Sequence, residues 1–337
     1  MPNPNNKKAL FDNHGRLINY VRLAVTDRCN LRCFYCMPEE GIEYVSRQEL
    51  MTYEEMERLL AVLAELGIQK VRITGGEPFV RRGMFEFMER VSRIPGIEQL
   101  HLTTNGTLTK DRIGDLKRMG LRSVNLSLDS LDRQRFLDIT RRDALPSVMA
   151  TFHGLLQHGI QTKINAVVMD GKNTDDLLSM AELTREHPIG MRFIEEMPFN
   201  GAGQHYTHLK WNHRYILRHL KKHYPNLEKI PDPPHSTSSN YRVPGYAGTI
   251  GIIAAYSRSF CGSCNRIRIT PKGLLKTCLY DDGVFNIRDI MRAGATDEQL
   301  KATFLGALAN RAKDGFEAEQ NRNFGRPITE SMSTIGG

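Results

Sequence analysis

The sequence predicts an α/β fold in which short strands alternate with helices around a parallel sheet. Six strand-length segments, rich in Val, Ile and Leu, punctuate the first 200 of its 337 residues. They are RLAVT (22–26), KVRIT (70–74), QLHLTT (99–104), SVNLSLD (123–129), TKINAVVM (162–169) and GMRFIEEM (190–197). Helical patterns lie between them, and repeated βαβ units place strands side by side in one parallel sheet.

The clearest of the intervening helices is expected over residues 52–67. There the apolar residues have helical spacing, Thr52 is an N-cap with Glu55 three residues later, and Gly67 is a stop. GMFEFMERVSRI, TKDRIGDLKRMG and LPSVMATFHGLLQHG carry similar patterns. Six units are fewer than the eight of a closed TIM barrel, and an open doubly wound sheet remains possible. In either architecture, ligands bind at the carboxyl ends of the strands.

Residues 198–249 interrupt this rhythm. A helix is expected at about 208–222, and the following PDPPHSTSSNYRVPGYAG reads as a crossing segment between two modules. Beyond it, TIGIIAAYS and the pair NRIRIT and LLKTCLY are expected to be strands, with a helix over 297–315. The final NRNFGRPITESMSTIGG lacks a core-forming pattern and is expected to be a mobile tail.

Charge and composition restrict the partners and the location. The net charge, 46 − 38 = +8, favours an anionic partner, although a mildly basic surface without specific meaning is the alternative. No apolar run approaches the ~18 residues of a membrane span. The N-terminal MPNPNNKKALFDNHGR lacks the apolar region of a secretory signal, so a cytoplasmic location is expected. Clustered cysteines in that compartment bind metal or perform redox chemistry more often than they form disulfides.

The stretch TDRCNLRCFYCMP places Cys29, Cys33 and Cys36 directly after the first strand. Three thiolates on one loop can hold three corners of a cubane iron–sulfur cluster. A structural zinc site needs four ligands, and no histidine is close in sequence, so one metal position is expected to be open for chemistry. A zinc site completed by a distant ligand, or a redox pair of Cys33 and Cys36, is the alternative.

Other unusual residues follow the strands at the same expected rim. TGGEP (74–78) ends the second strand, and its two glycines allow the backbone to approach a ligand, although a simple turn would use the same residues. TTNG (103–106), SLDS (127–130) and Met197 end the third, fourth and sixth strands. Five strand ends therefore predict a binding site at one end of the sheet.

The remaining cysteines, Cys261, Cys264 and Cys278, form a second triad with the spacing C-x2-C-x13-C. Again no fourth ligand is obvious. A second cluster with an open iron is the preferred interpretation, and a zinc ribbon lacking one ligand is the alternative.

Two arginines follow this triad on a predicted strand. Arg266 and Arg268 are two residues apart and share one face, while Ile267 and Ile269 point to the other. Two guanidinium groups beside a metal site suit a polyanion such as a triphosphate. A solvated edge strand is the alternative.

The first motif, CNLRCFYC with an aromatic residue before its last cysteine, resembles the radical S-adenosylmethionine (SAM) enzymes. The resemblance implies that the open iron binds the amino and carboxylate groups of SAM, and that one electron then releases a 5′-deoxyadenosyl radical. The cofactor itself would supply the missing ligand. The resemblance also implies contacts to SAM by Tyr35, Gly75, Gly76, Glu77, Ser127 and Met197. Without it, Met197 would be interpreted as a core residue.

CGSCNRIRIT, its third cysteine and CNLRCFYC together resemble the GTP 3′,8-cyclase (MoaA) family of molybdenum cofactor biosynthesis, from Arg22 to Gly336-Gly337. This implies an incomplete (β/α)6 TIM-type barrel with a C-terminal α+β module carrying the second cluster. The implied division is an N-terminal extension (1–20), a radical SAM partial barrel (21–235), an auxiliary-cluster module (236–325) and a flexible tail (326–337). The terminal glycines resemble a family tail that reaches back toward the site.

The resemblance also implies the reaction and its residues. The radical would take hydrogen from C3′ of GTP, the ribose carbon would attack C8, and one reduction would give (8S)-3′,8-cyclo-7,8-dihydro-GTP. The open iron of the second cluster would bind the guanine edge. The implied GTP contacts are Arg22, Arg72, Thr103, Lys163, Arg266, Ile267 and Arg268. The implied catalytic residues are Cys29, Cys33, Cys36, Arg266 and Arg268, and all six cysteines are implied metal ligands.

The implied cofactors are two [4Fe-4S] clusters and SAM. The implied partners are GTP, an electron donor such as flavodoxin or ferredoxin, a second copy in a homodimer, and cyclic pyranopterin monophosphate synthase as the next enzyme, with no nucleic acid and no membrane.

Two competing functions remain at this stage. A radical SAM enzyme that modifies a peptide or small molecule generally has more cysteines in its C-terminal region, and the Arg266/Arg268 pair favours a phosphate. A zinc-bound nucleic-acid module would carry tetrahedral ligand sets and aromatic residues interleaved with basic ones, and the sequence has neither.

Overall fold

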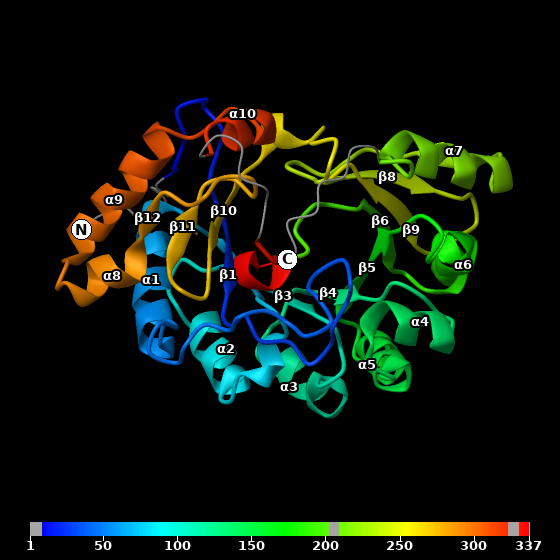
Figure 1. Cartoon of the computed structure of the whole chain (residues 1–337), viewed down its shortest axis with the longest axis horizontal. Coiled ribbons are helices and arrows are strands. Elements are labelled where there is room, and N and C mark those ends of the chain that lie inside the picture. Colours follow the sequence, from blue (N-terminus) through cyan, green and yellow to red (C-terminus); the bar gives the residue numbers. More distant parts are fainter. Residues whose placement is uncertain (1–8, 202–208, 323–329, 337) are drawn as a thin grey trace.

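The computed structural model describes residues 9–201, 209–322 and 330–336 of the chain. Within them, the strands form one twelve-stranded sheet in the order β12-β11-β10-β1-β2-β3-β4-β5-β6-β9-β8-β7. The sheet curves, with helices α1 to α6 along its outer side (Figure 1). The end of the described chain lies near the middle of the molecule, on the inner side of the curve.

The six central strands are parallel neighbours in chain order, which confirms the six predicted strands. They are β1 (Tyr20–Ala24), β2 (Lys70–Thr74), β3 (Gln99–Thr104), β4 (Ser123–Ser127), β5 (Gln161–Val168) and β6 (Gly190–Glu195). A doubly wound sheet reverses its strand order at a switch point, and the six parallel strands β1 to β6 do not. The architecture is therefore the partial barrel, and the open doubly wound alternative is wrong.

Helices connect these strands across the outer face. They are α1 (Tyr53–Leu66), α2 (Met84–Ser92), α3 (Ile113–Arg118), α4 (Arg133–Thr140), α5 (Leu145–Gln157) and α6 (Leu177–Glu186). In α1 the predicted capping box is present: Glu55 N donates to Thr52 Oγ1 at 3.2 Å, and Thr52 N donates to the Glu55 carboxylate at 2.7 Å. Gly67 ends α1 in a left-handed conformation, with φ 108°.

Strands from the second half of the chain extend both edges of the barrel. β9 (Thr249–Ile253) pairs in parallel with β6, and β10 (Arg266–Ile269) pairs in parallel with β1. β11 (Leu274–Lys276) follows β10 in an antiparallel hairpin, with β12 (Phe285–Asn286) beyond it. On the other side, β8 (Ser238–Arg242) and β7 (Glu228–Lys229) continue from β9. The C-terminal module thus shares the sheet of the barrel.

The remaining helices are α7 (His213–His223), α8 (Ile287–Arg292), α9 (Asp297–Ala309), α10 (Gly315–Gln320) and α11 (Met332–Ile335). The helix expected at 208–222 begins at His213, because the Asn212 side chain caps it; residue 208 lies outside the described residues. The helix expected to run to 315 ends at Ala309. No described helix is long and apolar enough to cross a membrane.

Part of the expected mobile tail has a defined position. Residues 331–335 form the N-cap and body of α11, whereas 326–329 and Gly337 lie outside the described residues. Ile335 is buried in a small apolar cluster with Phe199 and Tyr280. A single buried isoleucine in a short segment gives no periodic pattern, so the sequence did not reveal this anchor.

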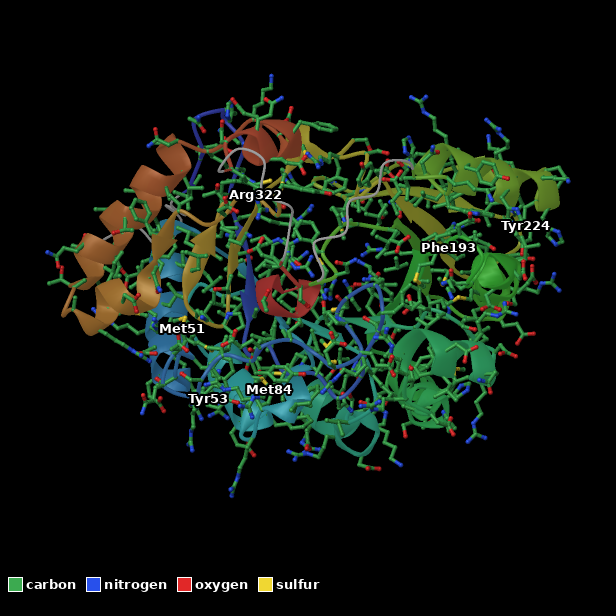
Figure 2. All side chains as sticks on the ribbon, viewed as in Figure 1. Met51, Tyr53, Met84, Phe193, Tyr224 and Arg322 are labelled. Carbon is green, nitrogen blue, oxygen red and sulfur yellow. The ribbon has the colours of Figure 1, made fainter. Side chains whose placement is uncertain are left out.

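The main apolar core lies between the strands and the outer helices. Phe193 on β6, Met84 on α2 and Met51 before α1 are all within it (Figure 2). Side chains alternate along each strand, so those that do not enter this core face the interior of the barrel. On β5, Ile164 is fully buried in the core, while its neighbours Lys163 and Asn165 are only partly buried. Polar and charged side chains can therefore collect inside the curve of the sheet.

Candidate active site

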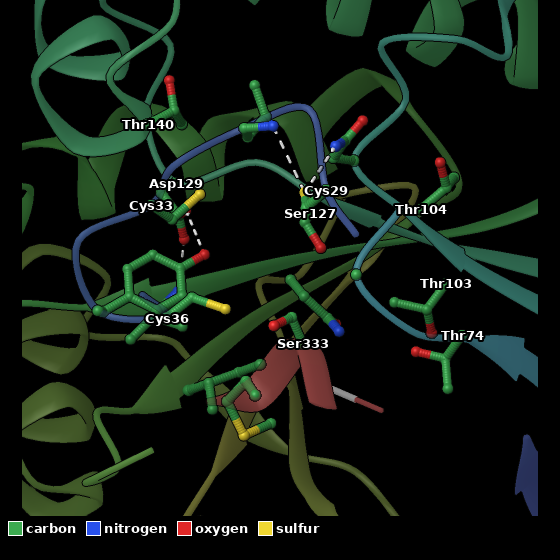
Figure 3. A pocket seen from close by; sticks show the side chains of 18 of the residues that line it. Cys29, Cys33, Cys36, Thr74, Thr103, Thr104, Ser127, Asp129, Thr140 and Ser333 are labelled. Atoms are coloured by element: carbon green, nitrogen blue, oxygen red, sulfur yellow. Dashed lines mark hydrogen bonds between the residues drawn. The ribbon is translucent and has the colours of Figure 1, made fainter. Parts of the chain in front are cut away.

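The first cysteine triad lines a cavity at the carboxyl ends of the central strands. Figure 3 shows Cys29, Cys33 and Cys36 around it, with Ser333 of α11 on another side. Leu31 N donates to Cys29 Sγ at 3.4 Å, and Cys36 Sγ lies 3.7 Å from Ser331 Oγ. Burial and the nearby Glu77 raise the pKa of Cys29 to about 12. A thiol so buried becomes a thiolate when a metal binds it.

The TGGEP segment forms part of the same cavity wall. Gly75 and Gly76 line the cavity, and a Cβ on Gly76 would lie 2.2 Å from the carbonyl oxygen of Arg28. Glycine is therefore needed where the end of β2 packs against the cysteine loop. Glu77 differs from expectation, because it is fully buried behind the wall and does not line the cavity.

The Glu77 carboxylate instead joins the ends of two strands. It accepts hydrogen bonds from Thr104 Oγ1 at 2.8 Å and from Asn105 N at 2.7 Å. Burial raises its pKa to about 7. Glu77 thus holds the β3 end, and with it Asn105, whose side-chain Nδ2 lies 3.7 Å from Cys29 Sγ.

Replacing Gly76 with alanine is expected to prevent the cysteine loop from closing on β2. The backbone clash at Arg28 O cannot be relieved by a rotamer change, so the first triad would be displaced. Iron per chain after anaerobic purification should fall by about half if each triad holds four irons. Gly306→Ala is the control, because a Cβ at this exposed position of α9 meets nothing within 4 Å. Full iron content in Gly76→Ala would contradict the expectation.

The structure brings most of the predicted cofactor residues together. Tyr35, Ser127 and Met197 line the first cavity, and so does Thr103, which had been expected at the nucleotide. The sequence reasoning did not single out Asp129, which lines the same cavity and accepts a hydrogen bond from Tyr35 Oη at 2.8 Å. Burial raises the pKa of Asp129 to about 6. Its place in SLDS at a strand end was the available signal.

The second triad lines a second cavity. Cys261, Cys264 and Cys278 share it with five arginines, Arg22, Arg192, Arg258, Arg266 and Arg268. The register explains the grouping, because Arg22 on β1 pairs with Arg268 on β10 and with Arg72 on β2. Arg192 was missed by the sequence reasoning, although it alternates with buried Met191 and Phe193 on β6.

Four predicted nucleotide residues do not line this second cavity: Thr103, which lines the first, and Ile267, Arg72 and Lys163. Ile267 packs in the main core, because strand alternation turns it away from Arg266 and Arg268. Arg72 is buried behind the wall, where it donates to Tyr20 Oη at 2.7 Å and to Leu102 O at 2.6 Å. Lys163 is not among the lining residues either, yet it lies within the electrostatic reach of Arg72 and Arg192.

The two cavities meet. Asn165, Ile194, Met197 and Met332 line both of them, so a molecule in one would face a molecule in the other. Three buried side-chain oxygens on these walls have no hydrogen-bond partner among the described residues: Thr103 Oγ1 in the first cavity, Asn125 Oδ1 in the second and Asn165 Oδ1 in both. Native proteins seldom leave such atoms unsatisfied, which indicates bound polar ligands.

The interior is strongly cationic. Burial and Arg268 lower the pKa of Arg22, and burial and Arg72 lower the pKa of Arg192 to about 10. Burial and Arg192 likewise lower the pKa of Lys163 to about 7. Although burial opposes it, Arg72 and the other cations lower the pKa of Tyr20 to about 7. Gathering like charges in a poorly solvated interior is costly, and a bound polyanion would offset that cost.

Comparisons with known proteins agree with this geometry. Residues 23–184 match the Radical SAM superfamily, and residues 189–316 match the Molybdenum Cofactor Synthesis C family. The chain is 39% identical to the GTP 3′,8-cyclase of Syntrophomonas wolfei over 335 residues, which cover 97% of this chain and 100% of that one. The chain belongs to the GTP 3′,8-cyclase family. Residues 23–184 place it in the radical SAM superfamily, whose members use SAM and a [4Fe-4S] cluster.

The chain is also similar to two animal proteins. The chain is 40% identical to molybdenum cofactor biosynthesis protein 1 of Drosophila melanogaster over 304 residues and 39% identical to that of Homo sapiens over 311 residues. Each match includes 90% of this chain. The chain spans about half the length of these relatives, 54% of the first and 48% of the second.

Solved structures share the fold. The crystal structure of Streptococcus suis SuiB bound to S-adenosylmethionine superimposes with a TM-score of 0.58 at 13% identity, covering 86% of this chain and 69% of that one.

The donor sets of both triads fit the clusters of the GTP 3′,8-cyclase family. The three thiolates of a cubane bind three different irons, and each triad supplies three cysteines. The all-sulfur donor sets and the unsatisfied polar atoms on the cavity walls fit two clusters with ligands between them.

Proposed function

We propose that the chain is a GTP 3′,8-cyclase that converts GTP to (8S)-3′,8-cyclo-7,8-dihydro-GTP, with cleavage of SAM to 5′-deoxyadenosine and methionine. This is the first step of molybdenum cofactor biosynthesis. The observation that carries the proposal is the cationic second cavity, which has five arginines beside a cysteine triad and shares lining residues with the first cavity. A triphosphate supplies the negative charge that this interior lacks.

In this proposal Cys29, Cys33 and Cys36 hold the first cluster, and Cys261, Cys264 and Cys278 hold the second. Tyr35, Gly75, Gly76, Ser127 and Met197 form the wall against which SAM binds. When bound, the first cluster and SAM supply the radical that removes hydrogen from C3′ of GTP. Glu77 acts through the β3 end that it holds rather than by contact with SAM.

The arginines hold the triphosphate and so fix the ribose. Arg22, Arg266 and Arg268 stand on adjacent strands β1 and β10, where their fixed spacing suits several phosphate oxygens at once. If the arginines hold the triphosphate and the second triad binds the base, the ribose would lie where the two cavities adjoin, beside Met197 and Asn165. Such positioning can contribute roughly 7–11 kcal/mol to catalysis.

Incubation of the reduced, anaerobically purified protein with SAM and GTP tests the proposal directly. We expect the cyclised nucleotide and 5′-deoxyadenosine to form together, and no cyclised nucleotide to form without SAM. Formation of 5′-deoxyadenosine at the same rate with and without GTP, and no modified nucleotide, would instead favour the alternative of a radical SAM enzyme that modifies a peptide or another small molecule.

Lys163 gives the binding of GTP a specific pH dependence. With a pKa of about 7 in the free protein, its side chain is largely neutral at pH 8, and a bound triphosphate would restore the proton. We expect GTP binding at pH 8 to take up a proton and to weaken as the pH rises above 7, by up to about tenfold per pH unit. Calorimetry in two buffers of different ionisation enthalpy measures the uptake.

The control for this measurement is Lys163→Met. That variant should bind GTP without the part of the proton uptake that Lys163 provides, leaving any contribution of Tyr20. Equal proton uptake in the variant and the unaltered chain at pH 8 would contradict the assignment of the proton to Lys163.

We further propose a cytoplasmic enzyme that receives electrons from a donor such as flavodoxin or ferredoxin, forms a homodimer and passes its product to cyclic pyranopterin monophosphate synthase. Family membership supports these partners. The division at residue 235 into a radical SAM barrel and an auxiliary-cluster module stays a prediction.

A further inference from the structure

A buried arginine lies directly behind the second cysteine triad. Arg311, between α9 and α10, is 4% exposed and does not line the second cavity. Its Nη2 donates to Cys264 Sγ at 3.3 Å and to Arg266 O at 3.0 Å. Its Nε donates to Thr277 O at 3.0 Å, and its Nη1 donates to Cys264 O at 3.1 Å. The guanidinium group therefore contacts the triad from the protein side, away from the position of a nucleotide.

The N-terminal segment fixes this guanidinium group. Asp12, whose side chain is fully buried, accepts from Arg311 Nη1 at 3.1 Å and from Arg16 Nε at 2.6 Å. Arg16 in turn donates to Cys261 O at 3.2 Å. With Asp12, every one of the five N–H donors of Arg311 has an acceptor. Arg311 cannot swing away from Cys264 without leaving several buried groups unpaired.

The first triad has no equivalent donor among the described residues. The groups that approach its sulfurs are neutral: a backbone N–H and the Asn105 amide at Cys29, and the Ser331 hydroxyl at Cys36. Arg32 Nη1 donates to Cys29 O at 2.6 Å, but no cation among the described residues donates to a sulfur of this triad, and the buried carboxyl groups of Glu77 and Asp129 lie near Cys29 and Cys33. Among the described residues, the second triad therefore differs from the first in having a cationic hydrogen-bond donor at a sulfur.

We propose that Arg311 is a positioning residue that raises the reduction potential of the second cluster, so that the second cluster accepts an electron before the first. The inference rests on the proposed function, because it needs a cluster at each triad. A reduced cluster carries one more negative charge than an oxidised one. A fixed cation that donates a hydrogen bond to a ligating sulfur therefore stabilises the reduced form more strongly.

The different hydrogen-bond donors at the two triads agree with the different tasks of the two clusters. The cluster that cleaves SAM needs a low reduction potential, and neutral donors with nearby carboxylates favour that. The cluster that holds the nucleotide does not cleave SAM and has no such requirement. Arg311 is the cationic side chain that the structure places in hydrogen-bond contact with a sulfur of the second triad.

The test compares reduction potentials in two single-cluster backgrounds. One background replaces Cys29, Cys33 and Cys36 with alanine, and the other replaces Cys261, Cys264 and Cys278. Redox titration monitored by electron paramagnetic resonance (EPR) gives each midpoint potential, without any need for activity. Arg311→Gln should lower the potential of the second cluster, Arg311→Lys should lower it less, and the unaltered second cluster should have the higher potential of the two.

The control is Arg288→Gln in the same background. Arg288 is also a buried arginine of the C-terminal part of the chain, 9% exposed and located on α8. Its guanidinium group donates to Glu49 O and to the Asp289 carboxylate and contacts no cysteine. We expect no change in potential for this variant. If it lowered the potential as much as Arg311→Gln, a general loss of packing would be the cause and the inference would be overturned.

Two other results would also overturn the inference. One is an unchanged potential in both Arg311 variants at full iron content. The other is loss of the cluster from both variants, since Arg311 would then serve assembly and not potential. The proposed function fails separately: if the unaltered second triad holds no iron–sulfur cluster, the two-cluster assignment itself is wrong.

Discussion

Replacing Cys33 with alanine is expected to abolish SAM cleavage while leaving the second metal site and the nucleotide site in place. The thiolate is one of three that would hold the first cluster, and Cys33 lines the first cavity only. The protein should keep about four irons per chain, since a [4Fe-4S] cluster would remain at the second triad. Iron and sulfide analysis, 5′-deoxyadenosine formation and GTP binding measure the three consequences.

The matched variant for this experiment is Cys278→Ala, at the second triad. It should also lose about four irons, yet it should retain SAM cleavage and lose the cyclised nucleotide. The two variants therefore separate the two sites. If Cys33→Ala still cleaved SAM, or if Cys278→Ala cyclised GTP at the rate of the unaltered chain, the division of labour between the triads would be wrong.

Replacing Arg192 with leucine is expected to weaken GTP binding without destabilising the ligand-free protein. Arg192 lines the second cavity. Burial and the nearby cations Arg72 and Arg266 lower its pKa to about 10. Removal of a hydrogen-bonded charge from an interface costs about 2–5 kcal/mol, which is at least about a 30-fold loss of affinity. Removal of one of several like charges from a buried site relieves repulsion in the absence of ligand.

GTP binding and the stability of the ligand-free protein are both measured for Arg192→Leu and for a control variant, Arg133→Leu. Calorimetry gives the affinity for GTP, and the unfolding temperature of the anaerobic ligand-free protein gives the stability. Arg133→Leu is the control, because Arg133 is an exposed arginine that pairs with Asp143 at the surface. It should change neither quantity appreciably. A large loss of stability in Arg192→Leu with unchanged GTP affinity would contradict the role assigned to the cationic interior.

Strand alternation and helix caps made much of the fold predictable. The six central strands and α1 followed from local patterns, since Thr52, Glu55 and Gly67 mark the ends of that helix in the sequence itself. The pairing of β9 with β6 and of β10 with β1 was not predictable, because contacts between strands far apart in the chain leave no local pattern. α4 and α6 were also missed, although both lie in the linkers between predicted strands.

The candidate site divides in the same way. Cysteine spacing and the Arg266/Arg268 alternation located the two triads and two of the five arginines of the second cavity. Arg192 needed the three-dimensional register, since an isolated arginine on a strand has no partner in sequence to indicate its role. Resemblance placed Glu77 and Ile267 at ligands, but burial behind the wall and strand alternation turn their side chains elsewhere.

The tail shows a third case. No periodic pattern distinguished residues 331–336, yet Ser331 Oγ donates to Cys36 O at 2.7 Å and Arg268 Nη1 donates to Gly336 O. This short segment contacts both triad regions through single hydrogen bonds and one buried isoleucine, Ile335. Such contacts depend on where the barrel places its partners, so only the folded structure can reveal them.

The central claim is that two incompletely ligated clusters lie in two adjoining cavities. Its most direct test is EPR spectroscopy of the two single-cluster proteins with each ligand. SAM should change the spectrum of the cluster at Cys29, Cys33 and Cys36 and leave the other unchanged, while GTP should change only the spectrum of the cluster at Cys261, Cys264 and Cys278. Spectra that respond to neither ligand would show that the chain itself completes the coordination of both metals, and the account would then be wrong.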